Sequence, residues 1–177
     1  MVRGKLSGLM ICALVLVAVG ARGYAAETTV KASAPIKGEG RFYKTGDNQL
    51  VFMGYFQGNV EVEGQRGDLH GAGMVCPGLM EVDRTDRTQE GEGRCIIAAS
   101  GGEFLYARWA CTGKPGEGCG GLFTITGGTG KFSKASGLSV FWMRSTVAEA
   151  VTTVPEKDVT ATFTGQALWE GLKYTTP

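Results

Sequence analysis

Glycine recurs throughout this chain between short runs of β-branched and aromatic residues, and this spacing constrains the fold more than any other feature. The 177 residues include 29 glycines and only 5 prolines. The glycines do not follow a Gly-X-Y repeat, which excludes a collagen-like structure. No segment carries a convincing i, i+3, i+4, i+7 apolar pattern of an amphipathic helix. The sequence therefore predicts seven to nine short strands, roughly ten residues apart, joined by tight turns.

These strands are expected to follow one another as hairpins, because no long crossover segment separates them. Consecutive hairpins favour an up-and-down meander, and closing the meander removes its exposed edges. We therefore predict an all-β fold, a closed antiparallel up-and-down barrel of about eight strands. The interior of a barrel of this size is filled by side chains or holds one small ligand. Bulges or bends are expected at Gly54 and Gly58, and a strand break at Pro77-Gly78.

The N-terminal region has the pattern of a secretory signal peptide. Two basic residues precede a short apolar run at 9–19, and small residues lead to Ala25. Because a transmembrane helix needs about 20 apolar residues, we expect cleavage, no stable membrane insertion and a periplasmic or secreted protein. The expected organisation is a signal peptide at 1–25, a flexible lead at 26–37 and one barrel domain at 38–177.

Four cysteines follow the expected cleavage site, and an even number in an exported chain indicates disulfides. Cys111 and Cys119 flank a Pro-Gly turn, and Cys76 and Cys95 lie on two runs joined by the turn segment "DRTDRTQ". We predict the pairs Cys76–Cys95 and Cys111–Cys119. The alternative, a four-cysteine zinc site, usually has close Cys-x-x-Cys pairs, and this chain has none. We expect no metal.

The segment "TITGGTGKFSKASG" at 124–137 raises the question of a phosphate-binding loop. A P-loop has four residues between its first glycine and the Gly-Lys pair, and it opens a helix. Here Gly127 comes only three positions before Gly130, and the next segment is extended. We therefore expect no nucleotide cofactor. Instead Gly127, Gly128 and Gly130 are predicted to form a structural turn, with Phe132 in the core.

The same segment carries a resemblance. "GLFTITGGTGKFSKASG" resembles the signature hairpin of the allene oxide cyclase barrel-like superfamily, which includes plant dirigent proteins. Together with "GEGRC" and "ARWACTG" it is closer still to small exported bacterial proteins of unassigned function, over 91–137. The resemblance implies an eight-stranded antiparallel barrel with a central cavity, assembled as a trimer in plant members. It implies no activity, because the catalytic residues of the plant cyclases lie outside this hairpin.

Charge and residue types limit the chemistry. The net charge of +1 argues against nucleic-acid binding through a basic surface. His70 is the single histidine, so a Ser-His-Asp or Cys-His mechanism would have to use it; a structural role is favoured. Glu61 and Glu63 share one strand face, where a solvated outer face is favoured over an acid–base pair. The sequence thus favours a protein that is not an enzyme.

Two strands carry arginine after aromatic residues of the same parity. Tyr106 and Arg108 share a face in "EFLYARWAC", as do Trp142 and Arg144 in "LSVFWMRST". If these faces line the barrel, the arginines could hold an anionic head group and the aromatic rings an apolar body. The alternative, favoured because charged residues usually face solvent, is that both arginines point outward or pair with Glu103 or Glu149. The candidate ligand-binding residues are Tyr55, Phe104, Tyr106, Arg108, Trp142 and Arg144.

Three functional hypotheses follow. The first is an exported barrel that binds a small apolar or amphipathic ligand, which an anionic group would suit. The second is a structural or interaction module with a packed barrel, and the third is a cyclase or isomerase that acts by confining its substrate. Apolar residues on both faces of runs such as "VFMGYF" also indicate a homo-oligomer.

Overall fold

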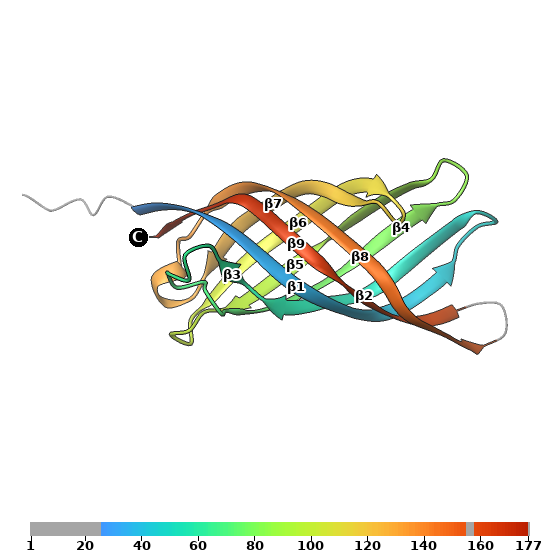
Figure 1. The fold of residues 1–177 in the computed structure, drawn as a ribbon, viewed down its shortest axis with the longest axis horizontal. Coiled ribbons are helices and arrows are strands. Elements are labelled where there is room, and N and C mark those ends of the chain that lie inside the picture. Colours follow the sequence, from blue (N-terminus) through green and yellow to red (C-terminus); the bar gives the residue numbers. More distant parts are fainter. Residues whose placement is uncertain (1–25, 155–157, 177) are drawn as a thin grey trace, which may run out of the picture.

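The computed structural model describes residues 26–154 and 158–176, which form a closed antiparallel β-barrel (Figure 1). The expected signal peptide at 1–25 lies outside the described residues. The strands are β1 (Ala26–Lys44), β2 (Gln49–Asn59), β3 (Glu61–Val62), β4 (Gly73–Asp83), β5 (Thr88–Ala98), β6 (Phe104–Lys114), β7 (Gly118–Gly128), β8 (Gly137–Val154) and β9 (Asp158–Thr176), with a short 3-10 helix η1 (Gly130–Phe132) before β8.

The long strands pair in chain order, and β1 closes the barrel by pairing with both β2 and β9. The short strand β3 adds to β1 through Ala32 and Ser33. All of these pairings are antiparallel, so the prediction of a closed eight-stranded up-and-down barrel is confirmed, with β3 as one extra strand. Figure 1 shows β3 and the end of β9 at one end of the barrel, which we call the capped end.

The first strand corrects the predicted domain boundaries. Residues 26–37 are not a flexible lead, because they pair with β9 from Ala26 opposite Thr176 onward. The small residues of this segment alternate with polar ones, and Ala32 and Ala34 are buried while the residues between and beside them are not. This period of two is the strand signal, and the segment's polar composition concealed it.

Side chains fill the interior of the barrel. Aromatic rings meet edge to face across it, as Phe56 does with Trp109 and Phe123 does with Trp169. The cavity between these rings measures about 30 Å³ and its lining is apolar. This is roughly a tenth of the about 300 Å³ at which small-molecule sites begin. The barrel is therefore packed, and the interior has no room for the ligand that the first hypothesis placed there.

Glycines make this packing possible. The ring of Trp109 lies against Gly78, Gly91 and Gly93, where an added Cβ would come within 2.5, 3.0 and 2.6 Å of ring atoms, respectively. The same relation holds for Phe52, whose ring would lie 2.5 Å from a Cβ on Gly40. Mid-strand glycines thus create the space that indole and phenyl rings occupy.

The mid-strand glycines make room for aromatic rings and do not mark the ends of strands. The register of β2 with its neighbours is continuous through Gly54 and Gly58, so the bulges expected there are absent. Strand β4 also runs through Pro77 and Gly78, and its pairing with β2 is continuous there, which corrects the predicted break. Its pairing with β5 is interrupted at Cys76 and Pro77.

Both predicted disulfides are present. Cys76–Cys95 joins β4 to β5, and Cys111–Cys119 joins β6 to β7. All four cysteines are buried, so the bridges are part of the barrel interior and not surface links. A disulfide stabilises a fold chiefly by restricting the unfolded chain, and these two act on adjacent strand pairs.

The contact of Trp109 with glycine gives a test of this packing. We expect Gly78→Ala to lower the free energy of unfolding by about 1–3 kcal/mol, because the new methyl group overpacks the interior. The matched control is Gly73→Ala in the same strand, where the nearest atom to an added Cβ is 3.9 Å away; its effect should stay within about 0.5 kcal/mol. Urea denaturation measures both, and equal losses in the two variants would contradict this account.

Candidate functional site

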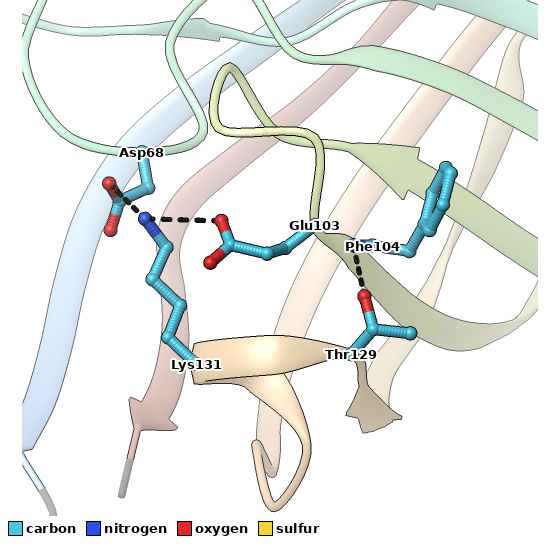
Figure 2. Close-up of polar contacts among 5 residues, drawn as sticks. All are labelled: Asp68, Glu103, Phe104, Thr129 and Lys131. Atoms are coloured by element: carbon cyan, nitrogen blue, oxygen red, sulfur yellow. Dashed lines mark hydrogen bonds and ion pairs between the residues drawn. The ribbon is translucent and has the colours of Figure 1, made fainter.

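The glycine-rich segment lies at the capped end of the barrel, where it contacts two other connections between strands (Figure 2). The Lys131 Nζ lies 2.6 Å from Asp68 Oδ1 in the β3–β4 connection and 3.7 Å from Glu103 Oε2 in the β5–β6 turn. The hydrogen bond with Asp68 raises the pKa of Lys131. Figure 2 shows the ammonium group between the two carboxylates, so this lysine is engaged in holding the connections together.

The glycines of this segment shape the turn out of β7. Gly127 and Gly130 have φ angles of +137° and +55°, in the range that favours glycine. Gly128 has no space for a side chain against Phe132. The chain then makes three residues of 3-10 helix and enters β8. A helix long enough to bind phosphate is therefore not formed here.

The closure of the capped end rests on Phe132 and Tyr174. Phe132 is fully buried, and its ring meets that of Tyr174 edge to face at 6.2 Å. The backbone N–H of Phe104 donates to Thr129 Oγ1 at 2.8 Å, and this bond fixes the segment to β6 (Figure 2). The arrangement is a plug that shields the barrel interior from solvent at this end.

Within the described residues, the histidine and the carboxylates do not come together in a catalytic arrangement. His70 Nδ1 accepts a hydrogen bond from the Val62 N–H at 3.2 Å and so holds the β3–β4 connection. Glu61 and Glu63 are exposed. Ser139 is the only buried polar or charged residue in the described part of the chain, and no group of potential metal ligands is found there. Nothing in this set resembles a catalytic dyad.

Tyr174 provides a pH test of the plug. Burial raises the pKa of its phenol, and the charge of Asp68 adds to the effect. A group whose pKa is raised on folding contributes stability that is present below its unfolded pKa of about 10 and lost as the pH rises through the folded value. We expect the free energy of unfolding to fall between about pH 9 and about pH 11, and to fall less in Tyr174→Phe. Urea denaturation at both pH values measures this, and equal falls would contradict it.

The six candidate ligand-binding residues do not line the barrel. Phe104, Tyr106 and Trp142 are about two-fifths exposed, and both arginines are exposed on the outer face. Tyr55 is half-buried on the outside, where its hydroxyl donates to Glu39 Oε2 at 3.0 Å, which raises the pKa of Tyr55.

The interior positions of these strands belong to the opposite parity. On β6 the inward residues are Leu105, Ala107 and Trp109, and on β8 they include Phe141 and Met143. Both parities are apolar in these strands, so alternation alone did not decide which face is buried. The hypothesis that the arginine-bearing faces line the barrel is therefore wrong.

The structure also separates the two arginines from each other. Arg108 lies opposite Thr124 on β7, which in turn lies opposite Leu138 on β8. Arg144 is six residues further along β8, a distance of about 20 Å at the rise of a strand. The two arginines cannot hold one head group.

The side chain next to Arg108 on the neighbouring strand is one that the sequence analysis did not identify as a candidate. Arg94 on β5 lies directly opposite Arg108, and both side chains are exposed. Neither arginine forms an ion pair within the described residues. Like charges directly opposite each other are destabilising. The sequence contains an indication of this neighbour pair, because Arg94 and Arg108 each lie seven positions from Gly101, in the turn that joins β5 and β6.

The arginine pair lies at one end of a depression on the outer face of the sheet. The part that holds Arg94 and Arg108 has a volume of about 660 Å³, and an adjoining part of about 400 Å³ holds Glu81 and Glu90. We call the two parts together the outer groove. The residues that line both parts are Leu79, Glu92, Ala110 and Leu122. The outer groove therefore has a basic end, an acidic end and a middle in which Glu92 lies among apolar residues.

An apolar surface continues from the outer groove across β7, β8 and β9. Leu122 lies opposite Val140, which is 72% exposed, and Trp142 lies opposite Leu168. The Trp142 ring covers the glycines of β7, since a Cβ on Gly120 would lie 2.7 Å from it. We call this surface the apolar patch. It consists of Leu122, Leu138, Val140, Trp142 and Leu168.

Comparison with protein-family models and with curated proteins found no match to this chain. Within 26–154 and 158–176, no helix has the length and apolarity that a membrane crossing requires. The outer groove and the apolar patch are therefore interpreted from their own geometry and charge.

Proposed function

We propose that this protein is an exported interaction module that binds a partner protein through the outer groove and the apolar patch. The carrying observation is that five large apolar side chains, each at least 39% exposed, adjoin one another on strands whose inward side chains are already buried. Contiguous exposed apolar surface beside charged residues is typical of protein interaction sites. Tryptophan and arginine, both present here, are enriched in such sites.

The two disulfides support export. Such bonds form and persist in oxidising compartments such as the periplasm and the extracellular space. The signal-peptide pattern at 1–25 agrees with this. We therefore propose a periplasmic or secreted location, where a barrel held by buried disulfides can present its outer face.

The other two hypotheses receive less support. A ligand inside the barrel would need to displace aromatic side chains from an interior whose cavity measures about 30 Å³. A cyclase acting by confinement needs a carboxylate or water beside a buried substrate. None of the carboxylates whose side chains the structure describes is buried. Binding of a partner protein on the outer surface is the hypothesis that agrees with both the packed interior and the exposed apolar patch.

We keep the resemblance to the allene oxide cyclase barrel-like superfamily as a proposal. The closed eight-stranded antiparallel barrel supports it. The packed interior departs from the central cavity that the resemblance implies, so we propose a shared fold without a shared ligand site.

Photo-crosslinking tests the proposed function. A photoreactive amino acid at Val140 should capture a discrete partner in the compartment to which the cell exports the protein. The same amino acid at Gln57, which is exposed on β2 away from the apolar patch, is the control. We expect one dominant crosslinked species at position 140 and none at position 57, because the interaction is confined to one face. No crosslink at position 140, or identical products at both positions, would contradict the proposal.

A further inference from the structure

We infer that the partner bound by the outer groove is a second copy of this chain, packed face to face with the strands of the two copies antiparallel. This inference rests on the proposed function and names its partner. It arises from the order of charges along the outer groove. If a second copy is turned end for end and placed on the first, the basic end of each groove meets the acidic end of the other.

The charges follow one another along β5. Its successive outward residues are Glu90, Glu92 and Arg94, all exposed, and Arg108 lies beside Arg94 on β6. Glu81 on β4 lies opposite Glu90. The basic row and the most distant acidic row are therefore four residues apart, or about 13 Å.

A two-fold axis that lies in the interface and runs across the strands reverses this order in the second copy. With the axis at the level of Glu92, the basic row of each copy faces the row of Glu81 and Glu90 of the other, and this contact forms twice because the interface is isologous. The Glu92 side chains of the two copies then lie beside the axis. A parallel arrangement would place arginine on arginine and glutamate on glutamate. Like-charge juxtaposition across an interface disfavours association, so the charge order selects the antiparallel arrangement.

The antiparallel arrangement also supplies carboxylate partners to the two arginines. Arg94 and Arg108 repel each other and have no carboxylate partner within the described part of one chain. The carboxylate of Glu90 from a second copy, with that of Glu81 beside it, would accept from their guanidinium groups, which present donors in a two-pronged geometry suited to carboxylates.

Apolar contacts accompany these charges. Leu79 and Leu122 lie between the basic and acidic ends of the outer groove, beside Ala110 and Glu92. The apolar patch extends the contact from Leu122 to Val140. An apolar centre with charged residues at its margins is the usual composition of a protein interface.

Charge reversal tests the inference on the full chain with both disulfides formed. The variant R94E/R108E makes both ends of the outer groove acidic, and E90K/E92K makes its acidic rows basic. We expect the wild-type chain to form dimers, and each variant alone to self-associate at least about 100-fold more weakly. An equimolar mixture of the two variants should form dimers that contain one copy of each, because the opposite charges then face each other again. Sedimentation velocity and native mass spectrometry measure the assemblies.

The matched control for R94E/R108E is K37E/K173E, which lowers the net charge by the same amount at exposed residues outside the outer groove. It should dimerise like the wild type. Circular dichroism and thermal unfolding establish that each variant is folded, and the heterodimer of the mixture is itself proof that both variants are native.

Three results would overturn the inference: a wild-type chain that stays monomeric at about 100 μM, a mixture that does not restore dimers, or a control that loses them. The crosslink from Val140 separates this failure from that of the proposed function. A crosslinked species with twice the mass of the chain supports self-association. A Val140 crosslink to a different protein retains the interaction module and rejects the second copy, whereas no Val140 crosslink rejects the module itself.

Discussion

The contact of aromatic rings with mid-strand glycines is the interaction on which the structure depends. Trp109 lies across Gly78, Gly91 and Gly93, and Phe52 lies against Gly40 and Gly54. A Cβ at any of these positions would occupy the space of a ring. Because the rings fill that space, the barrel closes around a solid core.

Much of the fold could be predicted because its signals are local. Hairpin order and the spacing of turns identified the closed barrel, and the turn flanked by Cys111 and Cys119 identified that disulfide. The first strand was missed because small residues such as Ala32 and Ala34 give a weak apolar signal, and only their pairing with β9 shows what they do.

The site was harder to predict than the fold, because it depends on which face of each strand is buried. Both parities of β6 and β8 are apolar, and the choice is made by distant partners: the glycines opposite Trp109 admit an indole on that side only. Tyr106 and Arg108 therefore lie outside. The pairing of Arg94 with Arg108 follows from the turn at Gly101, yet it becomes relevant only once both residues are known to face solvent.

The placement of the two disulfides has a consequence for how the barrel opens. Both bridges lie within β4 to β7, and the outer groove lies on the other side of the same four strands. The strands β8, β9, β1 and β2 carry no disulfide and are held by strand pairing and side-chain packing. If the barrel opens transiently, the bridge between β4 and β5 keeps Glu81 opposite Glu90, whereas the arginine pair spans β5 and β6, which no disulfide joins.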